Sequence, residues 1–242
     1  MHPVAVGIFC KTPTAGLSKT RLSPPLAAKD CATLSACFIR DLAATFEGLA
    51  RERLIAPYAV YTPVGSEEQL RALLRPGFEL LAQCEGEFGT RLLQSASELL
   101  AAGHAGAILV NADSPTLPAS ILRTAAQAIR DRDAVVLSPA LDGGYTLIGI
   151  SQLHAHLFQD IPWSTSDVFN RTVQRAGEIG VPVIEVPGWY DVDDAQTLRL
   201  LEAELAGELL PFAEPGVAGA PAAATRRFLE ERRAPALVGQ TW

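Results

Sequence analysis

The sequence predicts an α/β protein with one mixed, mostly parallel sheet and helices on both faces. Short, wholly apolar runs, which are typical of strands buried on both faces, alternate along the chain with longer segments of helical periodicity. A turn signal, Leu141-Asp142-Gly143-Gly144, separates two of the apolar runs and indicates one antiparallel pair. The expected order is therefore β-α-β-α-β-α-β-α-β-β-α-β-α in a single sheet.

The first half of the chain follows this alternation. The apolar run 4–10 ends in a loop of Pro, Gly, Thr and Lys and predicts a buried strand. Apolar residues at helical spacing predict a long helix over 27–50, with the charged side chains Lys29, Arg40, Asp41 and Glu47 on its outer face. Further strands are expected at 54–61 and 78–83, and further helices at 67–74 and 89–102.

The second half continues the pattern with strands at 107–110, 134–137, 145–150 and 183–186. A helix over 118–130 is expected to have Pro118 at its first position. Ser164-Thr165-Ser166-Asp167 predicts a capping box and a helix from 164 to about 179. Asp193 is expected to start a second capping box, which opens a helix that ends near residue 205.

We expect one domain over residues 1–206 and a tail over residues 207–242. The tail begins where the chain becomes rich in Ala, Pro and Gly, and residues 225–233 within it are compatible with one short helix. No internal repeat and no linker between domains is visible in the sequence.

Composition limits the function. The chain has 242 residues, 48% hydrophobic and 19% charged, with a net charge of -7, which argues against a nucleic-acid polymer as partner. No apolar run approaches the roughly 20 residues that span a bilayer, and the start lacks the features of a signal peptide, so we expect a cytoplasmic protein without membrane insertion. The cysteines at 10, 31, 37 and 84 lack metal-site spacing and are interpreted as core residues.

Polar residues collect where the predicted strands end, and open α/β sheets bind ligands outside the carboxyl ends of their strands. The loop after the first strand carries Lys11, Lys19 and Arg21 around Gly16, without the spacing of a Walker loop. Two interpretations stay open for it. The cations converge on an oligophosphate, or they form a solvated basic turn.

Acidic residues follow other strands. Asp113 comes after the strand at 107–110, and Asp191 and Asp193 come after the last strand. Asp113 and Asp193 are candidates for helix caps, but two acids facing a cationic loop also suit a divalent metal, Mg²⁺ or Mn²⁺, that bridges phosphates. Trp163 and Trp189 lie beside proposed site loops, where each can stack on a base or sugar or pack in the core.

Five segments in one order carry a family resemblance: FCKTPTAGLSKTRL, QCEGEFGTRL, NADSP, LDGGYTLIG, and WSTSDV together with DVDD. They resemble the rSAM/selenodomain-associated transferase family of the nucleotide-diphospho-sugar transferase superfamily, over about residues 4–205. The resemblance implies a GT-A fold, a nucleotide ligand and a divalent metal. It also implies metal ligation by Asp113 and Asp193, although the second acid of a full DxD motif is absent because Ser114 and Pro115 follow Asp113.

The resemblance and the positions of polar residues after the predicted strands together divide the expected site. Lys19 and Asp142 are the candidate catalytic residues. The nucleotide and its phosphates are assigned to Lys11, Gly16, Lys19, Arg21, Gln83, Gly89 and Arg91. The acceptor is assigned to Asp142, Gly143, Gly144, Tyr145 and Trp163.

Three functions remain compatible with these residues. The first is nucleotidyl transfer from a nucleoside triphosphate to a small-molecule acceptor with release of pyrophosphate, for which several cations in the first loop are suited. The second is glycosyl transfer from a nucleotide sugar, with Asp142 positioning or deprotonating the acceptor. The third is a nucleotide-binding module without catalysis.

Overall fold

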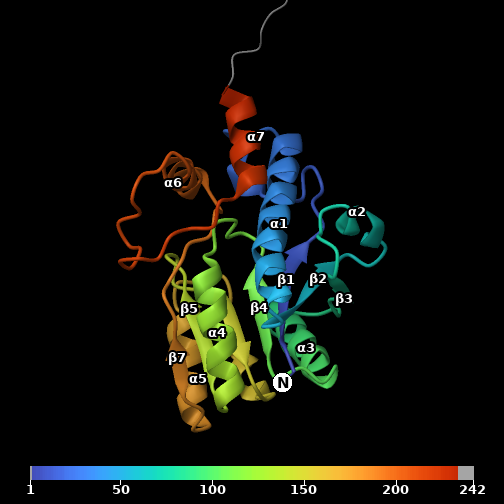
Figure 1. The fold of residues 1–242 in the computed structure, drawn as a ribbon, viewed down its shortest axis with the longest axis vertical. Coiled ribbons are helices and arrows are strands. Elements are labelled where there is room, and N and C mark those ends of the chain that lie inside the picture. Colours follow the sequence, from blue (N-terminus) through green and yellow to red (C-terminus); the bar gives the residue numbers. More distant parts are fainter. Residues whose placement is uncertain (1, 234–242) are drawn as a thin grey trace, which may run out of the picture.

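The computed structural model describes residues 2–233, and residues 234–242 of the expected tail lie outside this range. Its centre is a seven-stranded sheet with the order β3-β2-β1-β4-β6-β5-β7 (Figure 1). The strands are β1 (Val4–Lys11), β2 (Ile55–Thr62), β3 (Glu79–Ala82), β4 (Ala107–Asn111), β5 (Val135–Pro139), β6 (Tyr145–Ile150) and β7 (Val183–Glu185).

The sheet is mixed and mostly parallel. Strand β6 runs antiparallel to both of its neighbours, β4 and β5, and every other pair is parallel. The antiparallel pair expected around the turn at 141–144 is confirmed. The predicted fold class is confirmed as well, since unalternating apolar strands such as β1 need cover on both faces and obtain it here.

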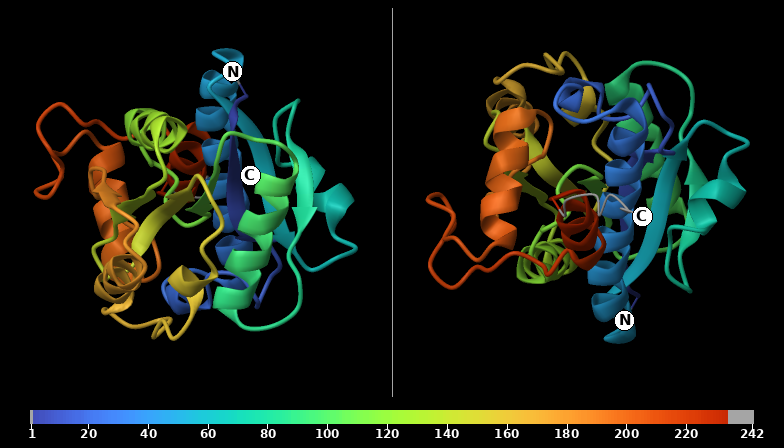
Figure 2. Two further views of the ribbon diagram at one scale, coloured as in Figure 1. Left: turned by 90° about the horizontal axis from the view of Figure 1, so that it is seen from below. Right: turned by 90° about the horizontal axis from the view of Figure 1, so that it is seen from above.

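Helices supply that cover (Figures 1 and 2). The helices α1 (Ala28–Arg51) and α4 (Ala119–Asp131) pack on one face of the sheet, and α3 (Phe88–Ala101) and α5 (Val168–Glu178) pack on the other. The remaining helical segments are α2 (Glu67–Arg71), α6 (Ala195–Leu205), α7 (Ala223–Arg233) and the 3₁₀ turns η1 (Thr20–Leu22) and η2 (Ala155–Phe158). No helix in the described range is long and apolar enough to cross a membrane.

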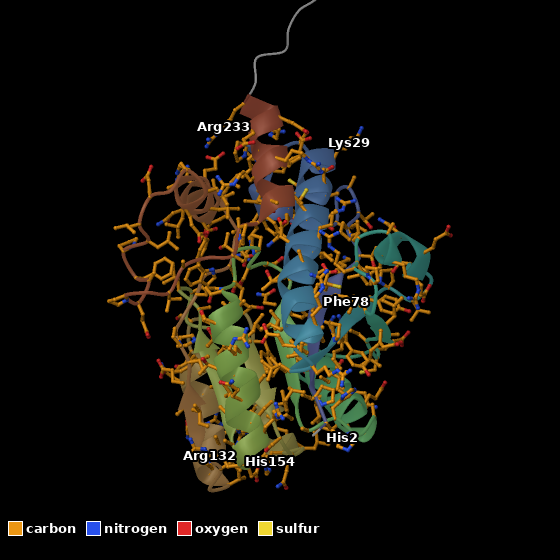
Figure 3. The ribbon with its side chains drawn as sticks, in the orientation of Figure 1. His2, Lys29, Phe78, Arg132, His154 and Arg233 are labelled. Carbon is orange, nitrogen blue, oxygen red and sulfur yellow. The ribbon has the colours of Figure 1, made fainter. Side chains whose placement is uncertain are left out.

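Helix α7 lies along α1, and Figure 3 shows Arg233 at the same end of the molecule as Lys29. The contact changes the assignment of Asp41, which the sequence pattern places on an outer face. Asp41 is in fact 5% exposed, and its two carboxylate oxygens accept hydrogen bonds from the amides of Ala224 and Thr225 at 2.8 and 2.9 Å. A buried carboxylate therefore caps the first turn of α7.

Two predicted helix starts are wrong. Helix α5 begins only at Val168, and its N-cap Asp167 makes no side-chain capping bond, so Ser164–Asp167 is not a capping box. That segment is held instead against the turn at Gly143, whose carbonyl accepts a hydrogen bond from the amide of Phe169. Helix α4 has Pro118 as its N-cap, one residue before its first helical position.

Of the four cysteines interpreted as core residues, Cys84 is the exception. Cys10, Cys31 and Cys37 are buried, whereas Cys84 is partly exposed. All four are free thiols.

The topology gathers the predicted site loops at one edge. Strands β1, β4, β5 and β7 point the same way, so their carboxyl ends meet at a single edge of the sheet. The chain builds β2 and β3 on one side of β1 and β4 on the other. The loops after β1 and β4 thus flank the switch point, which is the place where the strand order reverses. Open α/β sheets leave a crevice there.

Candidate functional site

The loop after β1 folds back on itself and buries one of its three cations. The amides of Leu17 and Ser18 donate to the carbonyl of Thr14, and Gly16 takes a φ of +79°, which favours glycine. Lys19 follows in a left-handed conformation with φ +49°. The side chain of Lys19 is 5% exposed, while that of Arg21 is 72% exposed.

Lys19 is the centre of the site. Its Nζ lies 2.7 Å from Oδ1 of Asp113 and 3.0 Å from Oδ1 of Asp193, and it donates to the carbonyl of Val192 at 2.7 Å. Burial alone lowers the pKa of Lys19, but the two carboxylates outweigh it and the pKa lies above its ordinary value. One ammonium group therefore joins the loop after β1 to the segments that follow β4 and β7.

Neither aspartate is a helix cap. Asp193 also accepts from Nη2 of Arg21 at 2.8 Å, and the residue that caps α6 is its neighbour Asp194, which accepts from the amides of Gln196 and Thr197. Asp113 precedes α4 by several residues, and the N-cap of that helix is Pro118. The capping interpretation is thus wrong for both, and their carboxylates face cations.

Asp191 adds a third carboxyl group beside them. Ser114 donates its hydroxyl hydrogen to Oδ1 of Asp191 at 2.5 Å. Burial, followed by repulsion from Asp113 and Asp193, raises the pKa of Asp191 to about 7 against the opposing effect of the Ser114 hydrogen bond. Sequence reasoning missed Ser114 as a partner, and the only signal for it is its place directly after Asp113.

Asp113 and Asp193 are the residues that would hold a divalent cation, if phosphates supplied its other ligands. Oδ1 of Asp113 and Oδ1 of Asp193 both lie within 3.0 Å of one ammonium nitrogen, so the fold already directs two carboxylates at one positive charge. Over residues 2–233 no group of three or more His, Cys, Asp or Glu side chains is arranged to hold a metal. Mg²⁺ commonly uses one or two carboxylates and completes its shell with water and substrate phosphates.

Gln83, Gly89 and Arg91 form a separate group beside β1 and β2. The buried Gln83 donates through Nε2 to the carbonyls of Cys10 and Val60, and its Oε1 accepts from Nη1 of Arg91 at 2.8 Å. The guanidinium of Arg91 also lies over the rings of Phe9 and Phe88, 5.9 and 5.5 Å from their centroids. Gln83 thus connects two strand ends to α3.

Trp163 packs onto the start of α3. Its ring meets that of Phe88 edge to face with centroids 4.9 Å apart. A Cβ at Gly89 would lie 2.8 Å from Nε1 of Trp163, so glycine permits this close approach. Trp189 is 1% exposed and donates to Thr116 in the core, which leaves Trp163 as the indole beside the site loops.

The turn at 142–145 is tightly built. Asp142 is exposed, and its Oδ1 accepts from the amide of Gly144 at 2.9 Å. Gly143 has φ +89°, and a Cβ there would lie 2.1 Å from the carbonyl oxygen of Ser166, so only glycine fits. The hydroxyl of Tyr145 is buried, and burial raises its pKa. No hydrogen bond within the described residues links Asp142 or Tyr145 to Lys19.

Comparison with solved structures shows the same architecture. A crystal structure from Desulfovibrio desulfuricans G20, of a protein provisionally named a nucleotide-diphospho-sugar transferase, matches with 26% identity and a TM-score of 0.80 over 96% of both chains. CMP:2-keto-3-deoxy-manno-octonic acid synthetase, complexed with CTP, matches at 14% identity and a TM-score of 0.53, covering 86% of this chain and 100% of that one.

A third similar structure is 4-diphosphocytidyl-2C-methyl-D-erythritol synthase from Anaerococcus prevotii DSM 20548. It is 10% identical with a TM-score of 0.53, and the match covers 85% of this chain and 96% of that one. At these identities the second and third structures establish the fold alone. No curated protein matches the chain.

A family model provides the remaining comparison. It matches residues 45–165, half of the chain, and takes in the segments that carry Gln83, Arg91, Asp113 and Asp142. The chain belongs to the bacterial family described as "Uncharacterized protein conserved in bacteria (DUF2064)".

Proposed function

We propose that this protein is a nucleotide-dependent transferase that moves a nucleotidyl group from a nucleoside triphosphate to a small-molecule acceptor and releases pyrophosphate. The observation that carries the proposal is the ammonium of Lys19, held between Asp113 and Asp193 at the switch point of the sheet. The arrangement brings a cationic loop and two acids from separate strand ends to one place, as binding of a metal and phosphates requires.

The loop after β1 is the proposed phosphate site. Lys11 is exposed at the end of β1, and the guanidinium of Arg21 forms an ion pair with Asp193. Among the described residues, the amides of Ala15 and Gly16 donate no hydrogen bond, so they are available to phosphate oxygens. Backbone amides and mobile cations together suit a ligand with several adjacent negative charges.

In the proposed reaction an acceptor oxygen attacks the α-phosphorus. A bond forms between them, the bond from the α-phosphorus to the bridging oxygen breaks, and pyrophosphate leaves with the electron pair. Lys11, Lys19 and Arg21 stabilise the charge that develops on the phosphate oxygens. A divalent metal held by Asp113 and Asp193 would supply Lewis-acid screening of the same charge.

The acceptor is proposed to lie toward the 142–145 turn and Trp163. Asp142 is exposed there, and Gly143 and Gly144 let a ligand approach the backbone closely. Gln83, Gly89 and Arg91 would contact the nucleotide. The five sequence motifs favour the rSAM/selenodomain-associated branch of the superfamily.

Glycosyl transfer from a nucleotide sugar is the second candidate. The observation in its favour is the match at TM-score 0.80 to a protein provisionally named a nucleotide-diphospho-sugar transferase. In this case a nucleoside diphosphate leaves, and the same loop and acids would neutralise it.

A ligand panel separates the two candidates. Nucleoside triphosphates and nucleotide sugars, each with Mg²⁺ or Mn²⁺, are tested for an increase in melting temperature, and pyrophosphate release is measured with candidate acceptors. A ligand at a hundredfold excess over its Kd stabilises by about 2.7 kcal/mol. Stabilisation by triphosphates supports nucleotidyl transfer, stabilisation by one nucleotide sugar supports the second candidate, and stabilisation by neither contradicts both.

Variants test the metal assignment. Asp113→Asn and Asp193→Asn are expected to abolish the extra stabilisation that Mg²⁺ or Mn²⁺ gives to bound nucleotide, because each substitution removes the negative charge of a carboxylate ligand. Asp194→Asn is the matched control, since asparagine keeps the capping oxygen of the neighbouring residue. A full metal-dependent shift in both site variants would place the metal elsewhere.

A further inference from the structure

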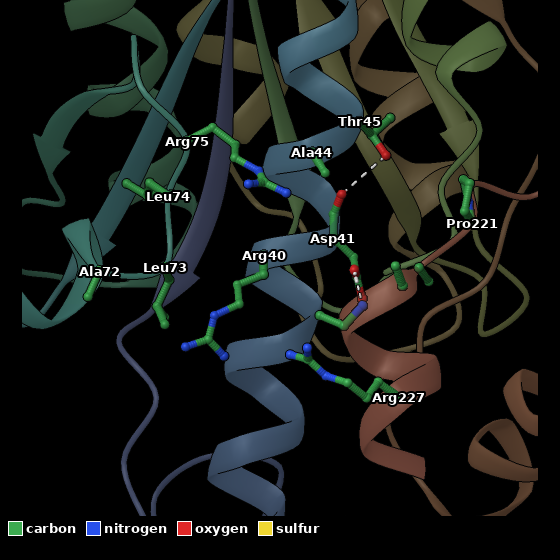
Figure 4. A pocket seen from close by; sticks show the side chains of 13 residues that line it. Arg40, Asp41, Ala44, Thr45, Ala72, Leu73, Leu74, Arg75, Pro221 and Arg227 are labelled. Carbon is green, nitrogen blue, oxygen red and sulfur yellow. Dashed lines mark hydrogen bonds between the residues drawn. The ribbon is translucent and has the colours of Figure 1, made fainter. Parts of the chain in front are cut away.

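A cavity of about 490 Å³, whose lining includes none of Lys19, Asp113 and Asp193, lies between α1, α7 and the segment that joins α2 to β3 (Figure 4). Its size is in the range of small-molecule pockets. Three arginines line it: Arg40 from α1, Arg75 from the α2–β3 segment and Arg227 from α7. Figure 4 shows the side chain of Arg227 extending from α7 toward α1, the helix that carries Arg40.

Three arginines and one aspartate line this cavity, which leaves an excess of positive charge. Arg75 has a carboxylate at the limit of ion-pair distance, with its Nε 3.8 Å from Glu47. No carboxylate in the described part of the chain is ion-paired with Arg40 or Arg227. The acidic residue among the lining side chains is Asp41, and both of its oxygens already accept from amides of α7.

Such an excess is unusual in this molecule, whose net charge is -7. Guanidinium groups that line one cavity repel each other, and an anion bound between them removes the repulsion. The planar fork of a guanidinium matches phosphate oxygens in paired hydrogen bonds. The other walls are mostly apolar, with Leu73, Leu74 and Pro221 among them.

We propose that this cavity is a second ligand site, which binds a small phosphorylated molecule. Its phosphate group lies between Arg40 and Arg227 within reach of Arg75, and its organic part lies against the apolar wall. Because Arg40 belongs to α1 and Arg227 to α7, the bound phosphate links the two helices and strengthens the docking of α7. Binding here does not require the transferase reaction proposed above.

Calorimetric titration with phenyl phosphate tests the site, with inorganic phosphate as a second probe. The titrations use the Lys11→Gln/Arg21→Gln protein, so that phosphate binding at the edge of the sheet does not contribute. In that background Arg40→Gln/Arg227→Gln is expected to weaken phenyl phosphate at least tenfold. The control pair Arg132→Gln/Arg199→Gln removes the same charge from exposed positions, and Figure 3 shows Arg132 at the opposite end of the molecule from α7.

The two probes separate the parts of the site. Phenyl phosphate is expected to bind more tightly than inorganic phosphate, because its ring contacts the apolar wall. Equal affinities would limit the site to the phosphate and overturn the apolar subsite. Unchanged affinity in Arg40→Gln/Arg227→Gln, an equal loss in the control pair, or no binding in the starting protein would overturn the whole site.

Amide NMR of the protein with native arginines gives a measurement that does not depend on how the variants fold. Phenyl phosphate is expected to shift the amide resonances of Thr45, Ala223 and Ala224, which line the cavity. Shifts confined to the loop after β1 would overturn the proposal, because they would place the phosphate at the edge of the sheet alone.

Discussion

Asp41 and Asp191 are both shielded from bulk water, but their surroundings differ. Both oxygens of Asp41, under α7, accept hydrogen bonds from backbone amides, and the nearby charge of Arg40 also lowers its pKa. Asp191, at the carboxyl edge of the sheet, meets the hydroxyl of Ser114 and two further carboxylates. Burial is the largest cause of a raised pKa in both.

The difference separates a structural carboxylate from one in a candidate site. The hydrogen-bond partners of Asp41 are two amides of one helix, so these bonds last as long as the helix stays docked. Asp191 interacts electrostatically with Asp113, Asp193 and Lys19, and the ammonium of Lys19 is ion-paired with the other two carboxylates. Any ligand or metal that alters the charge there alters all four groups, which is how binding sites differ from anchors.

The largest expected effect comes from removing the shared cation. Lys19→Met leaves the carboxylates of Asp113 and Asp193 without the ammonium that they share. Removing one partner of a buried ion pair costs about 3 to 5 kcal/mol. Because the two carboxylates are 31% and 29% exposed, we expect the lower end, about 3 kcal/mol, in the free energy of unfolding by urea.

Lys29→Met, at an exposed position near the start of α1, is the control and is expected to change little. Added Mg²⁺ is expected to restore part of the stability of Lys19→Met, since it replaces the missing charge. An unfolding midpoint equal to that of the unaltered protein would show that the ammonium does not hold the edge together.

Removing the carboxylate of Asp41 tests its structural role under α7. Asp41→Ala leaves the amides of Ala224 and Thr225 without their acceptors, and we expect a loss of about 2 kcal/mol in urea unfolding. Hydrogen exchange at these two amides is expected to accelerate more than exchange in the sheet. Asp41→Asn keeps one acceptor oxygen and is expected to lose less.

Asp30→Ala is the matched control for Asp41→Ala. It removes a second contact between α1 and α7, the ion pair of Asp30 with Arg232, at a partly exposed position. Surface pairs contribute about 0 to 1 kcal/mol, so its effect is expected to be smaller. Equal losses in the two variants would mean that the buried cap has no special role.

The same contrast shows what the sequence could predict. Periodicity identified the strands and helices because the spacing of apolar residues within each element reflects which of its faces are buried. The rule that ligands bind at the carboxyl edge selected Lys19, Asp113 and Asp193, which the structure brings together. Their partners were not predictable, since a local pattern suited a helix cap equally well and the pairing of Lys19 with Asp193 spans 174 residues.

Asp41 and the 164–167 segment failed for the same reason. Helical periodicity places Asp41 on the outer face of α1, because no nearby residue in the sequence indicates that α7 covers this position. Ser164-Thr165-Ser166-Asp167 has the residue types of a capping box, but Ser166 packs against the backbone at Gly143, where even a Cβ would not fit. In both cases a contact distant in sequence overrides a local preference.

The smallest expected effect is a pH dependence that belongs to Asp191. Its pKa is about 7 in the folded protein against 3.8 ordinarily, so the folded state holds this proton more tightly than the unfolded state. The resulting stability is fully present below the unfolded pKa and is lost as the pH rises through 7. Because the side chain is partly exposed, we expect the free energy of unfolding to fall by about 1 kcal/mol between about pH 5 and 8.

Asp191→Asn is expected to remove this fall, because asparagine carries no titrating proton and still accepts from Ser114. Asp194→Asn should keep it, since the pKa of Asp194 is lowered and its titration is complete below this range. Urea midpoints at both pH values and constant ionic strength give the measurement.

Ser114→Ala gives a sharper test. The Ser114 hydrogen bond lowers the pKa of Asp191, so the loss of this bond should raise that pKa and move the fall in stability to higher pH. A fall of the same size in Asp191→Asn would assign the titration to another group and remove the distinction drawn between Asp191 and Asp41.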